Sequence, residues 1–137
     1  MSTHFEDIQK MYRQFGLLVY DSPGHLTRRK LQERLECLQE ELDEFRQACN
    51  TQNLYEQADA LIDLVVFALG TAVMLGLPWQ ALWDDVLRAN LTKARGVGKR
   101  GHAVDLVKPS DWVPPQTLKI LLQAGYEPSD ETRRDDQ

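Results

Sequence analysis

The chain has 137 residues, of which 42% are hydrophobic and 27% charged, a composition that predicts one globular domain with a substantial core. Its formal net charge of −5 argues against a general nucleic-acid binder, which would carry a broad basic face, but not against a small anionic ligand as partner. The N-terminal MSTHFEDIQK lacks the basic-then-apolar order of a signal peptide. Cys37 and Cys49 would lie about 18 Å apart along one helix, beyond disulfide reach, so we expect reduced thiols in a cytoplasmic protein.

Apolar residues at helical spacing predict the first two helices. The first runs from Phe5 to about Phe15. The linker 17–20 is apolar for a loop, so we expect it to pack down or to line a pocket. The second helix has Thr27 as its N-cap and ends near Asn50. Its core-facing stripe is expected to consist of apolar residues in steps of four and three: Leu31, Leu35, Leu38, Leu42 and Phe45.

A third helix is expected from about Leu54 to Met74, with Gly76 as its C-terminal stop. Over residues 58–77 it is apolar on every side apart from isolated polar residues and glycines, and such a helix is enclosed by protein. The apolar stretch 64–77 is shorter than the roughly 20 residues that a membrane span needs, so we expect no membrane association. In a chain this small, the pattern predicts a central helix with an oligomer interface on its far side.

The rest of the chain predicts two more helices, at about 78–94 and 115–124, joined by the basic loop ARGVGKRGH and the segment DLVKPSDWVPP. The segment EPSDETRRDDQ has no core-forming residue, and the tail 126–137 is expected to be disordered. No strand is expected. The predicted fold is an all-α bundle of four to five helices around a central apolar helix, with one domain over residues 1–125 in a homo-oligomer, either a dimer or a tetramer.

Asp59 and Asp63 interrupt the apolar third helix. They lie roughly 40° apart around the helix, at about 100° per residue, so both project from one side, and Glu56 falls on the same stripe. An ionised carboxylate in such surroundings is costly unless a cation compensates it. A salt bridge to an arginine or a cap on a helix end is one interpretation, but no basic residue occurs between Arg46 and Arg88 to supply it locally.

The second helix contributes the segment QEELDEF, which contains Glu40, Glu41, Asp43 and Glu44. Taken alone, this segment is typical of a solvated acidic face, because Glu40 and Glu44 point away from the leucine stripe. Combined with the aspartates of the neighbouring antiparallel helix, it predicts a carboxylate cluster that divalent cations make tolerable. Oxygen ligands favour Mg²⁺, or Mn²⁺ in its place, over zinc, and the three histidines show no ligand spacing.

Between residues 88 and 108 the charge reverses, since six basic residues face one acid, Asp105. Asn90 and Lys93 stand three apart near the end of the fourth helix, and Arg95 follows them. A glycine-rich basic loop beside an acidic metal cluster suits a polyphosphate. The alternatives are a merely solvated loop and a nucleic-acid-binding segment; because no aromatic interleaving supports the second, we expect no nucleic acid as a partner.

The sequence resembles the all-α nucleoside triphosphate pyrophosphohydrolase superfamily, specifically its MazG-like branch. Four segments carry the resemblance, in family order over roughly residues 5–122: QEELDEF, DALIDLVVFALGTAVMLGLPW, WDDVLRANLTKARG and DLVKPSDWVPP. The first half of the family's metal motif is Glu-Glu-x-x-Glu, matched by Glu40, Glu41 and Glu44. The match to Asn-x-x-Lys is Asn90 with Lys93, and Lys108 with Trp112 resembles a C-terminal loop that folds toward the nucleotide.

The second half of the metal motif, Glu-x-x-Asp, is not matched in full. If Asp63 is the aspartate, the glutamate position is occupied by Ala60, and Asp59 would substitute from the same helix face. In the alternative register, Glu56 and Asp59 form the pair. We prefer Asp63 with Asp59, and the number of bound metals depends on this choice.

The resemblance implies cleavage between the α- and β-phosphates of a nucleoside triphosphate, giving a monophosphate and pyrophosphate, with two or more Mg²⁺ ions. It implies Glu41, Glu44 and Asp63 as metal ligands, with Asp59 as a further ligand or an acceptor beside them. Glu40 would orient or deprotonate the attacking water. The residues expected to offset phosphate charge or bind substrate are Asn90, Lys93, Arg95, Lys108 and Trp112.

Three other interpretations stay open. A relative of the same fold removes pyrophosphate from phosphoribosyl-ATP, a dUTP-directed enzyme fits the same metal motifs, and a helical scaffold would have no chemistry. The preference for a particular nucleotide base is not determined by these motifs. The linker 17–20 and the N-terminal helix are the candidates for lining the base-binding pocket. Since some phage-borne relatives act on guanine nucleotides, (d)GTP is the first substrate to test.

Overall fold

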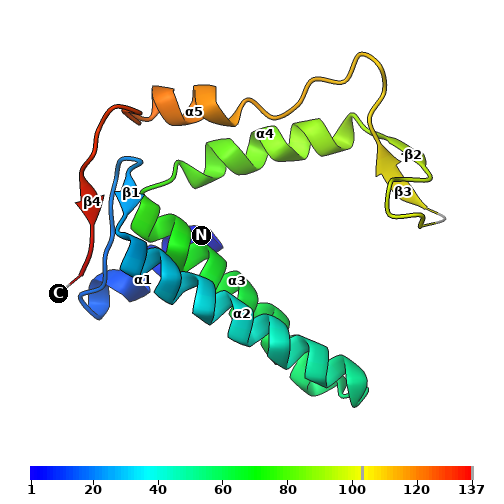
Figure 1. The fold of residues 1–137 in the computed structure, drawn as a ribbon, viewed down its shortest axis with the longest axis horizontal. Coiled ribbons are helices and arrows are strands. Elements are labelled where there is room, and N and C mark those ends of the chain that lie inside the picture. The colour runs from blue at the N-terminus through cyan, green and yellow to red at the C-terminus, as the bar shows by residue number, and fades with distance from the viewer. Residues whose placement is uncertain (103, 137) are drawn as a thin grey trace.

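The computed structural model describes residues 1–102 and 104–136, which form five helices and four short strands (Figure 1). In chain order these are α1 His4–Gln14, β1 His25–Leu26, α2 Arg28–Asn50, α3 Leu54–Leu75, α4 Trp79–Leu91, β2 Ala94–Gly96, β3 Asp105–Val107, α5 Thr117–Gln123 and β4 Arg133–Arg134. The all-α class is confirmed. The strands were not predicted because each has only two or three residues, too few to show an alternating pattern.

Helices α2 and α3 form a long antiparallel hairpin whose ends follow from local sequence. Thr27 caps α2 by accepting a hydrogen bond from the Lys30 amide at 3.1 Å, and Asn53 caps α3 by accepting one from the Glu56 amide at 3.1 Å. At the far end of α3, Gly76 takes the left-handed conformation with φ of 67°, which stops the helix at little steric cost. These boundaries agree with those expected from the sequence.

Helix α1 crosses the second half of α3 and closes a small core around Ile8, Tyr12, Leu26, Leu69, Val73 and Met74. Gly70 permits the crossing, because a Cβ there would lie 1.8 Å from the Tyr12 hydroxyl oxygen. That hydroxyl accepts a hydrogen bond of 2.8 Å from Arg34 of α2. The linker 17–20 packs down as expected, with Leu18 and Val19 against this core.

The expected core-facing stripe of α2 is buried only along one edge: Leu38 and Phe45 are half-buried, whereas its other three members are exposed. Leu35 is 60% exposed, and Leu31 and Leu42 are exposed as well. The buried residues of α2 lie on the neighbouring face, which packs against α3 and, at its N-terminal end, meets the tail: Lys30, Arg34, Glu41 and Ala48. Leu31, Leu35 and Leu42 therefore form an apolar surface that one copy of the chain leaves uncovered.

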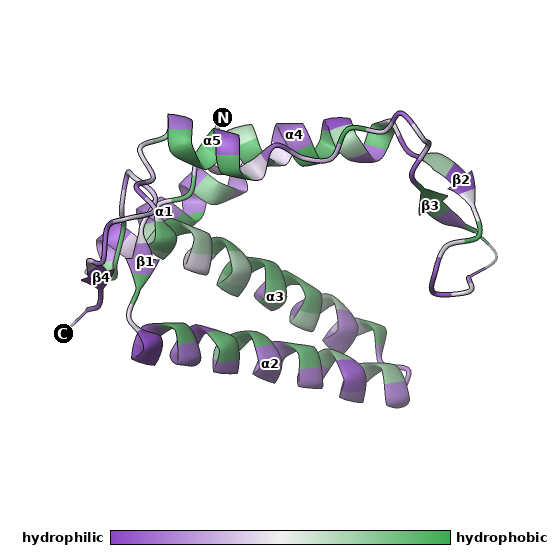
Figure 2. Ribbon diagram, turned by 45° about the horizontal axis from the view of Figure 1, so that its top comes forward, coloured by the Kyte–Doolittle hydropathy of each residue, from purple (hydrophilic) through white to green (hydrophobic). Residues whose placement is uncertain are grey.

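Helix α3 is likewise only partly enclosed. It is apolar for most of its length (Figure 2), and its 22 residues are long and apolar enough to cross a membrane by length and composition alone. In the structure it packs against α1 and α2, yet Ile62 remains 65% exposed. One chain therefore does not supply the complete cover expected for a central helix.

An arm made of α4, the β2–β3 ribbon and α5 diverges from the α2–α3 hairpin (Figures 1 and 2). Helix α4 runs outward, the antiparallel β2–β3 ribbon forms the tip, and the chain returns along α4 to α5. Arg88 ties the two legs together by donating to the carbonyls of Val113 and Pro114 at 3.3 and 3.2 Å. Asp85 adds a 2.6 Å bond from the Gln116 amide.

Residues 126–136 pack against the rest of the chain, in contrast to the disorder expected from the sequence. Strand β4 pairs in parallel with β1, and the Tyr126 hydroxyl lies 3.2 Å from the His25 ring nitrogen Nε2. The contacts that hold the tail are mostly polar, so they leave no apolar periodicity from which order could have been predicted.

We expect Gly76→Ala to destabilise the fold more than Gly16→Ala. Both glycines have φ near 70°, where a side chain costs roughly 1–2 kcal/mol. Only at Gly76 would the new Cβ also clash, at 2.1 Å from the Ser22 carbonyl oxygen, whereas Gly16 has nothing within 4 Å. In urea unfolding, Gly76→Ala should lower the free energy of unfolding by about 1–3 kcal/mol more than Gly16→Ala does. Equal losses of unfolding free energy in the two variants would contradict this contact.

Candidate active site

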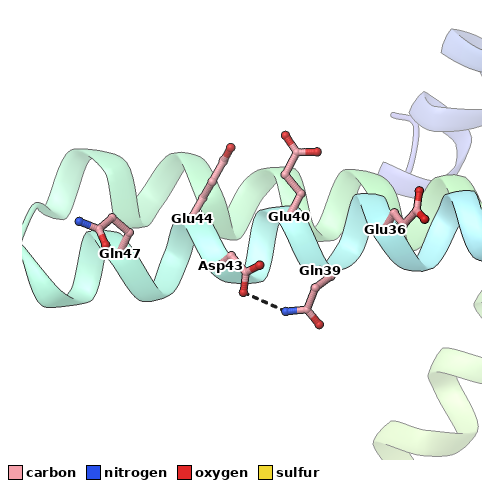
Figure 3. A pocket seen from close by; sticks show the side chains of 6 residues that line it. All are labelled: Glu36, Gln39, Glu40, Asp43, Glu44 and Gln47. Atoms are coloured by element: carbon pink, nitrogen blue, oxygen red, sulfur yellow. Dashed lines mark hydrogen bonds between the residues drawn. The ribbon is translucent and has the colours of Figure 1, made fainter.

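The predicted acidic residues lie along the facing middle parts of α2 and α3. Glu41 points toward α3 and is only 8% exposed, and its Oε2 atom has no hydrogen-bond partner in the described chain. Glu40 and Glu44 project together from one side of α2, while Gln39 and Asp43 point elsewhere and share a 2.9 Å hydrogen bond (Figure 3). The leucine stripe had suggested a solvated face for this segment, but the packing buries Glu41.

Burial raises the pKa of the Glu41 carboxyl group to about 7, because the charged form loses water that nothing replaces. The neighbouring acids act in the same direction: Glu44 contributes most after burial, followed by Asp63 across the helix pair and then Glu40. The structure thus brings three other carboxyl groups close enough to repel the charged form of Glu41. A proton on Glu41 or a cation bound beside it would relieve this repulsion.

A cavity of about 320 Å³ opens beside this cluster between the two helices. Its lining consists of Glu44, Gln47, Glu56, Asp59, Ala60 and Asp63. Ala60 forms part of the wall where the family motif has glutamate, and both Asp59 and Glu56 reach the same space. Both alignments of the metal motif, Asp63 with Asp59 and Glu56 with Asp59, therefore place an additional carboxylate in the cavity. The lining of the cavity is compatible with either alignment.

The donor set fits a hard divalent cation such as Mg²⁺ or Mn²⁺, since it consists of carboxylate oxygens. Within residues 1–102 and 104–136, no ion pair joins Glu41, Glu44 or Asp63 to lysine or arginine. Arg34, two turns before Glu41, instead donates to Tyr12, Thr71 and the Phe67 carbonyl. In the same residues, no three potential ligands already converge on one point, so exposed side chains such as Glu44 would have to turn to complete a metal site.

The basic residues gather at the outer end of the arm around Trp112. The ammonium groups of Lys93 and Lys108 lie 5.4 and 5.0 Å from the centre of the Trp112 ring. The indole nitrogen of Trp112 donates a 2.7 Å hydrogen bond to the Ala89 carbonyl, which fixes the ring against α4. Asn90 is exposed on the last turn of α4 and Arg95 is exposed on β2.

The two halves of the predicted site do not meet within one chain. The arm carries Lys93, Lys108 and Trp112 away from the hairpin that carries Glu41 and Asp63 (Figure 1). The expectation of a basic loop beside the acidic cluster is therefore wrong for a single copy. The sequence could not reveal this, because the direction of α4 depends on contacts between residues far apart in the chain, such as the stacking of Trp79 on Phe5 with ring centroids 6.0 Å apart.

One polar residue at the site was missed. Gln47 lines the cavity between α2 and α3 and also a hollow of about 500 Å³ on the side of α2 where Glu40 and Glu44 project (Figure 3). It lies three residues after Glu44, on the same helix face, and that spacing is the signal that could have identified it.

We expect the stability of the metal-free protein to fall as pH rises from about 5 to 8. Because the folded-state pKa of Glu41 is about 7 and its ordinary value is 4.5, the folded state holds the proton more tightly through that window, and ionisation destabilises it. With EDTA at pH 8, Glu41→Gln should therefore raise the Tm, whereas at pH 5 the two proteins should unfold together.

The matched control is Asp43→Asn, which removes an exposed acid of the same helix that pairs with Arg46 at 3.3 Å. It should leave the pH dependence unchanged. Added Mg²⁺ should raise the Tm of the parent and of the control but not that of Glu41→Gln. A parent protein whose Tm is flat between pH 5 and 8 in EDTA would contradict the described environment of Glu41.

Comparison with known families agrees with this geometry. The family model described as phosphoribosyl-ATP pyrophosphohydrolase matches residues 8–90, a segment that contains α2, α3 and the whole acidic cluster. No curated protein matches the chain. The match spans more than half of the chain, and the chain therefore belongs to the phosphoribosyl-ATP pyrophosphohydrolase family, within the all-α, MazG-like nucleoside triphosphate pyrophosphohydrolase superfamily.

Proposed function

We propose that this protein is a Mg²⁺-dependent nucleotide pyrophosphohydrolase that converts a nucleoside triphosphate to its monophosphate and pyrophosphate, with Mn²⁺ able to replace Mg²⁺. Family membership supports pyrophosphohydrolase activity in general. The observation that carries the metal dependence is the buried Glu41 carboxylate, which faces Glu44 and Asp63 without a cationic partner. Retaining such a repulsive cluster has a physical rationale if divalent ions bind there.

Each acid has a role that follows from its position. Glu41, Glu44 and Asp63 would hold Mg²⁺, with Asp59 or Glu56 adding a ligand from the cavity wall. When bound, the ions would neutralise phosphate oxygens and lower the pKa of water. Glu40 is exposed on the same side of α2 as Glu44, so its carboxylate is available to accept the proton of the attacking water.

The proposed reaction is a single displacement at the α-phosphorus, in which one bond forms and one breaks. A water oxygen bonds to the α-phosphorus, its proton passes to Glu40, and the bond from the α-phosphorus to the bridging oxygen breaks. Pyrophosphate leaves with that oxygen. Lys93, Lys108 and Arg95 would offset the charge of the phosphates, while Asn90 and Trp112 would help to position the nucleotide.

We further propose that the active protein is a homo-oligomer, a dimer or a tetramer, in which the arm of one copy reaches the acidic cluster of another. Two observations support this arrangement. The leucine stripe of α2 and the outer face of α3 are apolar and uncovered, and association would bury them. The basic arm and the acidic hairpin also carry opposite charges and are separated within one chain.

Phosphoribosyl-ATP is the second candidate substrate, and the family match supports it as well as a nucleoside triphosphate. The matched segment, residues 8–90, contains the metal-binding acids but ends before Lys93, Lys108 and Trp112. It therefore covers the chemistry common to both substrates and omits most of the proposed substrate-binding residues. A substrate panel that includes dUTP and (d)GTP separates these candidates, and absence of all turnover would favour the scaffold interpretation.

We expect Asp63→Asn to lower kcat for pyrophosphate release by about a hundredfold or more, because it removes a ligand charge from the cluster. The panel consists of the eight common nucleotides and phosphoribosyl-ATP, each with and without Mg²⁺. Asp43→Asn is the control and should keep parental turnover. Full Mg²⁺-dependent turnover by Asp63→Asn would refute the proposed metal site.

We expect two inactive variants to complement each other if the site is shared between copies. Glu41→Gln damages the hairpin half and Lys93→Ala the arm half, so a mixed dimer keeps one site free of both changes. An equal mixture refolded together should recover about a quarter of the parental activity. The control mixture of Glu41→Gln with Asp63→Asn, both in the hairpin, should recover none, and equal failure of the two mixtures would refute the shared site.

A further inference from the structure

The N-terminus of α2 has an unusual charge pattern. Its first three residues, Arg28, Arg29 and Lys30, are basic, and its first turn contains no acid. The helix dipole favours the opposite arrangement, since the exposed amides at a helix N-terminus carry partial positive charge. Lys30 is moreover only 6% exposed, so its charge needs a partner. The chain supplies the missing acids from its C-terminus.

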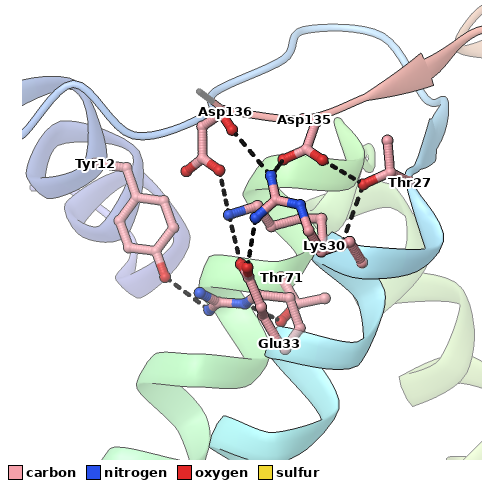
Figure 4. A network of polar contacts seen from close by, with 9 residues as sticks. Tyr12, Thr27, Lys30, Glu33, Thr71, Asp135 and Asp136 are labelled. Carbon is pink, nitrogen blue, oxygen red and sulfur yellow. Dashed lines mark hydrogen bonds and ion pairs between the residues drawn. The ribbon is translucent and has the colours of Figure 1, made fainter.

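Asp135 and Asp136 meet this basic turn (Figure 4). The Asp135 carboxylate accepts a 2.7 Å hydrogen bond from the Thr27 hydroxyl and forms an ion pair with Arg29. Asp136 forms an ion pair with Lys30, whose ammonium group also lies 2.8 Å from Glu33. The acids thus compensate both the clustered cations and the dipole of α2.

The residues just before these aspartates add a second set of contacts. Strand β4 lies in register with β1, and the Thr27 amide donates a 3.0 Å hydrogen bond to the Arg134 carbonyl. The Arg134 guanidinium lies over the Tyr20 ring at 3.9 Å and 3.5 Å from the Leu75 carbonyl oxygen. Leu75 is the last residue of α3, directly before the Gly76 junction from which the arm departs.

The pKa directions agree with persistent pairing. The hydrogen bond from Thr27, followed by that from Arg29, lowers the pKa of the Asp135 carboxyl group. Burial by itself would lower the pKa of Lys30, but Asp136 and Glu33 outweigh it, and the net pKa is raised. Both groups are therefore held in their charged forms.

The position of these contacts determines what they do. The arm is joined to the hairpin at Gly76 on its outgoing leg, and its returning leg, α5, leads directly into the tail. With the tail free, the arm would be held only at the base of its outgoing leg, by the Gly76 junction and by Trp79, which stacks on Phe5 of α1. Its outer part could then change direction more freely. With the tail bound, the returning leg is attached as well, through Tyr126 beside His25 and through strand β4, at the same end of α3.

We propose that Arg133–Asp136 form a strap that fixes the direction of the arm relative to the α2–α3 hairpin, so that breaking its ion pairs releases the arm to swing. The strap concerns the conformation of the chain and does not rest on the proposed function. Its effect on catalysis does, because the arm carries Lys93, Lys108 and Trp112. Holding these groups in one direction would lower the entropic cost of bringing them to a nucleotide.

The direct test measures the distance from the arm tip to the open end of the hairpin. Spin labels are placed at Thr51→Cys and Lys99→Cys, with Cys37 and Cys49 replaced by serine, and labelled chains are diluted into unlabelled ones. We expect Asp135→Asn with Asp136→Asn to broaden the distance distribution about twofold, as for a released hinge. The matched control, Glu127→Gln with Glu131→Gln, removes two tail acids that form no ion pair in the described residues and should leave the distribution unchanged.

A charge exchange makes the result specific. Arg29→Asp alone should broaden the distribution, because it faces Asp135 with a like charge, and adding Asp135→Arg should narrow it again. The helical circular dichroism of the double asparagine variant shows whether it is folded. If this signal is lost, the distance distribution is measured on Arg29→Gln instead, which changes an exposed residue and removes the same ion pair with Asp135. A distribution of parental width in a folded strap variant would overturn the proposal.

Activity gives a second readout that can fail separately. A released arm should raise KM for the nucleotide several-fold, with kcat near the parental value, because the acidic cluster stays intact. Thermal stabilisation by Mg²⁺ alone should also persist. If the distance distribution broadens but KM stays parental, the proposed strap is supported and the role of the arm in substrate binding is contradicted. If the distance distribution is unchanged, the proposed strap is refuted whatever the activity.

Discussion

The buried carboxylate of Glu41 is the constraint on which the rest of the molecule depends. Helix α3 packs on the face of α2 that carries Glu41, and this packing removes water from an acid already surrounded by Glu44, Asp63 and Glu40. A core built for stability alone would place an apolar side chain there. The fold instead accepts a repulsive cluster at the centre of its longest hairpin, which is the expected arrangement where a cation and an anionic substrate complete the charge balance.

The same packing choice explains why one chain looks incomplete. Because α3 covers the neighbouring face of α2, Leu31, Leu35 and Leu42 are left exposed, and apolar side chains on the outer face of α3 are exposed as well. The cations that would complement the acids lie on an arm that points away from them. Uncovered apolar surface and unbalanced charge are both resolved if copies associate through the hairpins, so oligomerisation and completion of the site would be one event.

The C-terminal strap adds a second level of control over the same geometry. An arm held only at the start of α4, by the Gly76 junction and the stacking of Trp79 on Phe5, would sample a wider range of directions, and the entropy of that motion would oppose substrate binding. Ion pairs between the tail and the first turn of α2 restrict it with groups that also relieve the charge imbalance of Lys30 and its neighbours. Helix termination, tail order and arm direction are therefore coupled at one end of α3.

Local sequence determined the features that depend on neighbouring residues in the chain. Helix boundaries at Thr27 and Gly76 followed from caps, and the grouping of Glu40, Glu41 and Glu44 with Asp63 followed from helical spacing and a motif resemblance. Only the tertiary structure decided which face of α2 is buried, where the arm points and that the tail is ordered. The buried face of α2 and its leucine stripe are offset by about one residue, roughly 100° around the helix, and contacts at the start of α4 direct a whole arm. These outcomes depend on contacts between distant residues that no local pattern encodes.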